Sequence, residues 1–352
     1  MFLALKEIKH EKLRYGLIIA MIVLISYLIF ILTSLALGLA RQNTTAIDSW
    51  GIDRIALNQD ANVNMSQSLL TKQQVPTKLS RHEAYLGQVP VVAKASGYTK
   101  TSAQFIGLDA HQFIAKNMQL VTGHKPTTNQ EIVVDTAFQN AGYHLGQWIH
   151  LNSYGQRFKI VGFVKDAKIN IAPIVYGSLT AWRNLKNVGP NLIASAIVSQ
   201  NGHFTQKNDQ LRYYSTDTFI SKLPGYSAQN TTFTFMIAFL MIISLIVIAV
   251  FLYILTVQKL QNYAVLRAQG IPAKTLIGAT IGQAVILVVS GLIIGTLLTA
   301  ITAFGMPASV PMTFDIPILS AVAAGLVVTG VIGSLFPIRM ILRVDPVSVI
   351  GG

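Results

Sequence analysis

The sequence contains no cysteine, which excludes a disulfide framework, a thiolate metal site and a cysteine nucleophile. Charge is also scarce, since only 12% of the 352 residues are Asp, Glu, Lys or Arg, against roughly 25% in an ordinary soluble domain. Acidic residues are rarer than basic residues, with 14 against 27. Because 52% of the residues are hydrophobic, this lack of charge indicates that much of the surface faces lipid.

Four long stretches lack charge altogether, and they predict four transmembrane helices at residues 16–40, 231–257, 275–304 and 316–336. Each can cross a hydrocarbon core of about 30 Å at about 1.5 Å per residue. The first stretch ends in Gly38-Leu39-Ala40, which could pass for a signal-peptidase site. A signal peptide has an apolar core of only about 7–15 residues, so a retained anchor is favoured.

The interiors of these stretches contain no Asp, Glu, Lys, Arg or His. This argues against an ion-coupled carrier, which needs buried ionisable groups to relay protons or ions. Gly278 with Gly282 and Gly291 with Gly295 have the four-residue spacing that allows helices to approach closely. The alternative is that glycine is simply common in membrane helices.

Residues 41–230 have the composition of a soluble domain and predict an α+β fold inserted between the first two spans. Helical patterns alternate with strand patterns, and Ser153-Tyr154-Gly155-Gln156 predicts a hairpin between two of the strands. The predicted strands are Asp53–Asn58, Val89–Ala95, Ala103–Leu108, Glu131–Asp135, Gln147–Asn152, Arg157–Val164 and Ile193–Ser199, and the helices Ala110–Asn117, Thr136–Ala141 and Leu179–Leu185.

The polar interruption at residues 258–274 is where a soluble partner could bind. Its apolar residues are spaced three to four apart, which predicts a short helix, and Gly270 followed by Pro272 provides the stop. The alternative is a solvated connector whose Lys and Arg only fix the orientation in the membrane.

Basic residues in the short segments predict the orientation. Residues 1–15, 258–274 and 338–352 hold four, three and two of them, whereas the turn at 305–315 holds none. Both termini and the 258–274 loop are therefore expected in the cytoplasm and residues 41–230 outside. Residues 1–15 predict an amphipathic helix on the membrane face, with apolar Phe2, Leu5 and Ile8 and basic Lys6, Lys9, Lys12 and Arg14.

Motifs for several other functions are missing. A P-loop requires glycine where the sequence has Ala268 and Ala273, so ATP hydrolysis must come from a separate chain. The histidines lack the spacing of a helical zinc site, and no Gly-x-Ser-x-Gly elbow of a hydrolase occurs. The basic residues are scattered rather than arranged in a stripe with aromatics, so nucleic acid is not an expected partner.

Several segments resemble the FtsX-like permease family, which comprises subunits of the MacB type of ABC transporter. The similar segments are Ala4-Leu5-Lys6-Glu7-Ile8, Leu145-Gly146-Gln147-Trp148-Ile149, Phe158–Gly162, Val265-Leu266-Arg267-Ala268-Gln269-Gly270 and the closing Val344-Asp345-Pro346-Val347. Four spans with one large insertion after the first is also the layout of this family. Asn262 is a departure, because many members carry Glu there.

The resemblance implies a multi-pass permease of the cell membrane that acts as a homodimer with two copies of a separate ATPase. That ATPase, with its ATP and Mg, would bind the coupling helix through Leu260, Tyr263, Leu266, Arg267 and Gly270. The chain itself is then no enzyme and binds no cofactor of its own. In its length and in its opening and closing segments, the chain looks closest to the haem-exporting permeases of Gram-positive bacteria. Export of peptides, lipoproteins or macrolides, or non-transporting control of a cell-wall hydrolase, are the alternatives.

If haem is the cargo, its site is expected at the outer ends of the first two spans. Haem needs an apolar slot, an iron ligand and a cation near its propionates. Tyr226 and Met236 are the proposed ligands, Phe233 the apolar wall and Arg41 the cation. The alternative is that Tyr and Arg are interface anchors and Met a packing residue.

Overall fold

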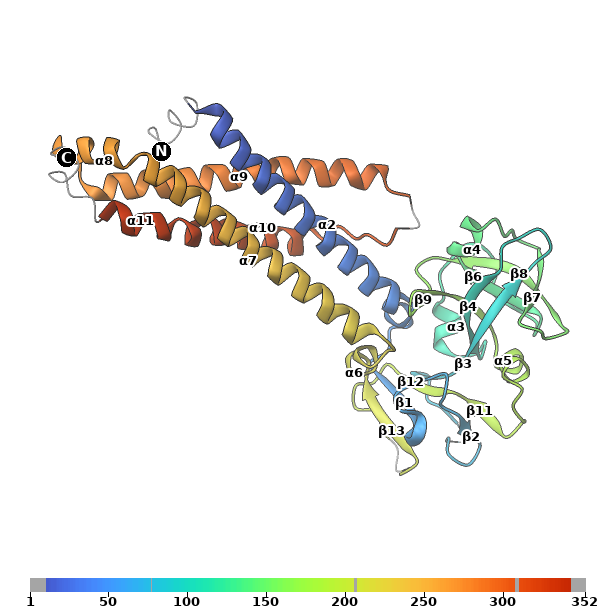
Figure 1. Ribbon diagram of the computed structural model, residues 1–352. Coiled ribbons are helices and arrows are strands. Elements are labelled where there is room, and N and C mark those ends of the chain that lie inside the picture. The colour runs from blue at the N-terminus through green and yellow to red at the C-terminus, as the bar shows by residue number, and fades with distance from the viewer. Residues whose placement is uncertain (1–10, 77, 206–207, 308–309, 343–352) are drawn as a thin grey trace. The chain divides into compact units, whose positions relative to one another are not determined.

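The computed structural model describes residues 11–76, 78–205, 208–307 and 310–342 (Figure 1). The chain forms two compact units, which we call the membrane unit (residues 1–38 and 230–352) and the outer unit (residues 39–229). Of the tail predicted at residues 337–352, the first six residues belong to α11 (Leu335–Leu342) and the rest lie outside the described residues, as does most of the predicted N-terminal amphipathic helix.

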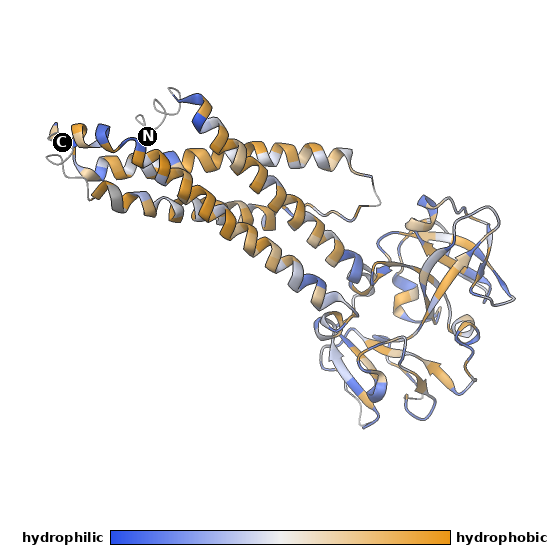
Figure 2. Cartoon of the chain, viewed as in Figure 1, coloured by the Kyte–Doolittle hydropathy of each residue, from blue (hydrophilic) through white to orange (hydrophobic). Residues whose placement is uncertain are grey.

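The membrane unit is built on helices that are long and apolar enough to span a bilayer (Figure 2). These helices are α2 (Lys12–Trp50), α7 (Tyr226–Gln258), α9 (Ala273–Gly305) and α10 (Ile316–Gly333), the last continued by α11 (Leu335–Leu342). The predicted fold class, four membrane helices with a large mixed domain after the first, is confirmed.

The helix ends differ from the sequence prediction. Helix α2 runs to Trp50 rather than ending at Ala40, and its 39 residues span about 58 Å, well beyond the hydrocarbon core. Its residues from Leu39 onward belong to the outer unit. Helix α7 begins at Tyr226 rather than residue 231, and the predicted fourth span is divided at Ser334.

Helices α2 and α9 pack closely through two glycines. A Cβ atom on Gly291 would lie 2.5 Å from Ile22 Cγ2, and one on Gly295 would lie 2.3 Å from Ser26 Oγ. The packing interpretation is therefore confirmed for this pair. It does not hold within this chain for Gly278 and Gly282, where such an atom would meet nothing within 4 Å.

These contacts predict that Gly291→Leu destabilises the membrane unit while Gly282→Leu does not. Filling a packed contact costs typically about 1–3 kcal/mol because neighbouring side chains must move. Thermal unfolding of the two purified variants in the same detergent measures the difference. Equal midpoints for Gly291→Leu and the unchanged chain would contradict the observed packing.

The outer unit is organised around one sheet of mixed direction, with strand order β13-β1-β12-β3-β4-β10-β6-β8-β5. The pairs β4–β10 and β6–β8 are parallel, β7 joins β3 and β8, and β9 pairs with β10. Strands β2 and β11 form a separate pair. The strands are β1 (Arg54–Asn58), β2 (Leu70–Thr71), β3 (Glu83–Lys94), β4 (Thr101–Leu108), β5 (Leu120–Gly123), β6 (Glu131–Asp135), β7 (Trp148–Leu151), β8 (Arg157–Val164), β9 (Lys168–Ile169), β10 (Ala172–Ser178), β11 (Leu192–Ala194), β12 (Ala196–Ser199) and β13 (Leu211–Ser215).

Short helices complete the outer unit, namely η1 (Gln59–Ala61), α3 (Phe113–Asn117), α4 (Thr136–Asn140), α5 (Leu179–Lys186) and α6 (Thr216–Ser221). Helix α5 packs through the fully buried Trp182 onto Gly87 and Gly107, which lie opposite each other on β3 and β4. A Cβ atom on either glycine would come within 2.6 Å of the Trp182 side chain, so the two glycines leave the space that this side chain occupies.

Candidate functional site

The polar interruption forms helix α8 (Leu260–Ala268) between α7 and α9. It ends as predicted, because Gly270 has a positive φ of 90° and Pro272 follows. The Gly270 N–H donates to the Arg267 carbonyl at 3.0 Å, and the Ile271 N–H to the Leu266 carbonyl at 3.1 Å. These bonds satisfy carbonyls that a helix end leaves open.

The coupling hypothesis assumed that Tyr263 contacts a partner, but Tyr263 lies on the inward face of α8. Tyr263 is only 3% exposed and packs with Leu276 of α9 and Ile341 of α11, and Leu266 packs against the same cluster. The prediction that Tyr263 is offered to a partner is therefore wrong, because α9 and α11 already cover it.

The outward face of α8 instead centres on Val265, which is 47% exposed. Of the other residues predicted for coupling, Leu260 and Arg267 are half-buried and Gly270 is exposed. Sequence spacing missed this outward set because it defines two faces without indicating which one neighbouring helices will cover. The exposed residues of α8 and its C-cap are Gln261, Asn262, Val265, Ala268 and Gln269.

The last turns of α2 form part of the core of the outer unit. Ala46, Ile47 and Trp50 are buried there, and the Trp50 indole N–H donates to the Tyr176 hydroxyl of β10 at 3.0 Å. Burial raises the pKa of Tyr176 well above its ordinary value, so the hydroxyl stays protonated. The end of a membrane helix is thereby fixed to a central strand of the sheet.

A second attachment comes from the turn between β9 and β10. The backbone N–H of Ile171 donates to the Gln42 carbonyl at 3.2 Å, and that of Asn170 to the Asn43 carbonyl at 3.3 Å. Ile171 has a φ of 67°, which is strained for a β-branched residue. The contacts with α2 thus coincide with backbone strain in the turn.

The predicted haem residues divide between the two units. Arg41 is exposed on α2, and Tyr226, the first residue of α7, packs half-buried against the core of the outer unit. Phe233 and Met236 lie further along α7 in the membrane unit, where Met236 is exposed. Among the described residues, no group of three or more His, Asp or Glu could hold a metal ion.

The membrane unit also contains an apolar cavity of about 470 Å³ that the sequence did not indicate. Phe30 of α2, residues of α9 and α10, and Phe314 line it. The hydroxyls of Thr299 and Ser320 donate to carbonyls of their own helices, so the cavity wall is almost entirely apolar. It could accept an apolar group, but it offers no iron ligand.

Comparison with known proteins supports the resemblance seen in the sequence. Residues 234–346, which include α8, α9 and α10, match the family described as FtsX-like permease, C-terminal. The chain carries an FtsX-like permease domain. This permease also has relatives along its whole length. A Staphylococcus epidermidis protein named as the hemin transport system permease HrtB is 24% identical over 100% of this chain and 99% of its own length.

Relatives outside the staphylococci have a similar sequence identity. An uncharacterized ABC transporter permease of Mycobacterium tuberculosis is 23% identical, again over 100% of this chain and 99% of the relative. Among solved structures, the periplasmic region of MacB from Actinobacillus actinomycetemcomitans is similar with a TM-score of 0.36 and 14% identity. That similarity covers 49% of this chain and 92% of the MacB region.

Proposed function

We propose that this permease is the membrane subunit of an ATP-driven ABC exporter and that its cargo is haem. The observation that carries the proposal is the extent of the similarity to the hemin transport permeases, which covers the whole chain, including the outer unit. At 24% identity it supports the transporter class more strongly than the cargo.

The ATPase partner docks on the outward face of α8. This face combines amide side chains with the exposed Val265, whereas Tyr263 and Leu276 hold α8 against the membrane unit. An apolar side chain exposed at the end of a bundle is well suited to a partner's cleft. In this proposal two permease chains bind two ATPase chains, with the ATPase in the cytoplasm and the outer unit outside the cell.

ATP-driven closure of the ATPases displaces α8, and the membrane helices carry this motion to the outer unit. Helix α2 suits this role because it is one continuous helix whose last turns are buried in the core of the outer unit. Cargo is taken from the outer leaflet or outer face. No polar channel through the bilayer is then needed, in keeping with uncharged helix interiors.

The proposed haem site uses the ligands predicted from the sequence. Met236 is exposed on α7 and can offer its thioether to iron, whereas the half-buried Tyr226 serves a packing role as well. Phe233 adds apolar surface, and Arg41 is the proposed cation for the propionates. The apolar cavity beside Phe30 is a second place for the ring, although iron would lack a ligand there.

We therefore expect the purified permease to bind haemin with a saturable shift of the Soret band. Met236→Leu, and Tyr226→Phe, which keeps the packing of the ring, should each weaken binding about tenfold, or about 1.4 kcal/mol, through loss of an iron ligand. Met306→Leu is the matched control, since Met306 is exposed but outside the proposed site. Unchanged titrations in the double variant would remove this site and leave the transporter class standing.

Control of a cell-wall hydrolase remains the alternative function. It predicts stable co-purification of the permease with a hydrolase and no stimulation of the ATPase by haemin. Export predicts the opposite on both counts, so the two functions are separable with the same purified complex.

A further inference from the structure

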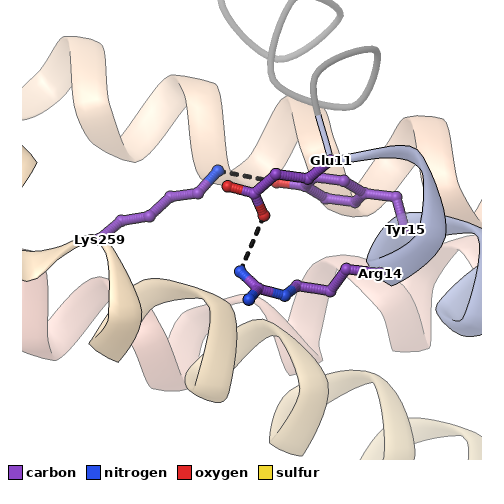
Figure 3. A network of polar contacts seen from close by, with 4 residues as sticks. All are labelled: Glu11, Arg14, Tyr15 and Lys259. Atoms are coloured by element: carbon purple, nitrogen blue, oxygen red, sulfur yellow. Dashed lines mark hydrogen bonds and ion pairs between the residues drawn. The ribbon is translucent and has the colours of Figure 1, made fainter.

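A buried lysine lies at the junction of α7 and α8. Lys259 follows the last residue of α7 and immediately precedes α8, yet it is only 7% exposed. Its Nζ donates a 2.9 Å hydrogen bond to the hydroxyl of Tyr15, in the first turn of α2 (Figure 3). Burial of an ammonium group is costly unless polar partners receive it, so this contact is specific rather than incidental.

Tyr15 is itself held firmly. Its side chain is 1% exposed and packs in the core of the membrane unit with Ile18 and Ile22. The Lys259 ammonium also lies 5.4 Å from the centre of the Tyr15 ring, within the range of a cation–π contact. The neighbouring Glu11–Arg14 ion pair, 2.8 Å apart, is partly exposed and contributes little to fixing the position of Tyr15.

The Lys259–Tyr15 pair connects three helices, namely α7, α8 and α2. The Lys259 carbonyl accepts the Tyr263 N–H of α8 at 2.9 Å, and the Lys259 N–H donates to the Thr256 carbonyl of α7 at 3.1 Å, so the Lys259 backbone links these two helices. Its side chain is anchored on α2, which is the helix that ends inside the core of the outer unit. The apolar cluster around Tyr263 connects α8 to α9 and α11.

We infer that the Lys259–Tyr15 pair is the joint that transmits displacement of α8 to α2. This inference rests on the proposed docking of an ATPase on α8 and goes beyond it by naming the route of the motion. Without the joint, the ATPase still assembles and hydrolyses ATP, but α2 and the outer unit no longer follow.

The absence of native cysteine allows a direct test. A single cysteine at the exposed Ser153, in the β7–β8 turn, carries a fluorophore that reports motion of the outer unit when ATP is added to the permease–ATPase complex in lipid. In this background, Tyr15→Phe and Lys259→Met should lower the ATP-dependent signal at least tenfold with ATPase binding unchanged. Lys259→Arg should retain it, because it keeps a buried cationic donor.

Lys274→Met is the matched control, since Lys274 is exposed near the start of α9 and its loss changes the net charge equally. It should leave the signal unchanged. Wild-type signals in both Tyr15→Phe and Lys259→Met would overturn the joint while sparing the proposed function. If the otherwise unmodified chain neither binds an ATPase nor responds to ATP, the proposed function fails, and the joint with it.

Discussion

Val265→Asp is expected to abolish assembly of the permease with its ATPase while leaving the permease folded. Val265 is exposed at the centre of the outward face of α8, so a carboxylate there does not disturb the contacts of the membrane unit. In a partner's apolar cleft, however, the charge would be buried without a counter-ion, which costs several kcal/mol. At least a hundredfold loss of affinity follows, measured by co-purification and by ATPase binding to immobilised permease.

Tyr263→Ala is the informative companion variant. Tyr263 is buried against Leu276 and Ile341, so its truncation should lower the melting temperature of the membrane unit, with any loss of ATPase binding following from the damage to α8. Assembly at wild-type affinity in Val265→Asp would contradict the docking face. Lowered stability in Val265→Asp itself would contradict the assignment of this side chain to the outward face.

Trp50→Ala is expected to lower the free energy of unfolding of the outer unit by about 3–5 kcal/mol, the usual cost of emptying the place of a large buried aromatic side chain. Trp50 is buried with Ala46 and Ile47, and its indole N–H bonds to Tyr176. The variant also removes one attachment of the end of α2, so ATP-driven motion of the outer unit should weaken together with its stability.

Trp148→Ala provides the matched control, because this tryptophan is 47% exposed and an exposed substitution usually changes stability by less than about 0.5 kcal/mol. Pulse proteolysis of the full-length variants in urea, following cleavage within residues 39–229, reports both values. Similar urea midpoints for Trp50→Ala and Trp148→Ala would contradict the view that the end of α2 is part of the core of the outer unit.

The sequence predicted the membrane spans well because lack of charge over 20 or more residues is a strong local signal. It misplaced the end of the first span because Arg41, Gln42 and Asn43 are polar and resemble the start of a soluble domain. The helix continues because Ala46, Ile47 and Trp50 recur at helical spacing and are covered by the outer unit.

Strand β10 illustrates what local patterns could not predict. It lies between β4 and β6 in the sheet, yet Pro173 and Gly177 both weaken its strand signal. Pro173 is tolerated near the strand's start, opposite Lys168 of β9, and Gly177 lies against the ring of Phe105. Phe105 is distant from β10 in the sequence, and the pairing with Lys168 depends on the turn between β9 and β10. A short stretch of sequence around β10 therefore cannot reveal these contacts.

The sequence predicted the short helix of the coupling hypothesis but not which of its faces stays exposed. Spacing predicted a short helix that ends at Gly270, and that helix is present. The side that stays exposed depends on the positions of Leu276 and Ile341, which come from α9 and α11. Those tertiary contacts decided between Tyr263 and Val265.

ATP-driven haemin export by the reconstituted complex is the most direct test of the proposed transport function. The full chain, purified with the ATPase that it binds, is inserted into lipid vesicles oriented so that ATP reaches the α8 side, and haemin appearing on the opposite side is captured by a haem-binding protein. If the permease exports haem, capture requires ATP, saturates with haemin and is lost in Val265→Asp. Capture at the same rate without ATP, or unchanged capture in Val265→Asp, would contradict the proposed transport function.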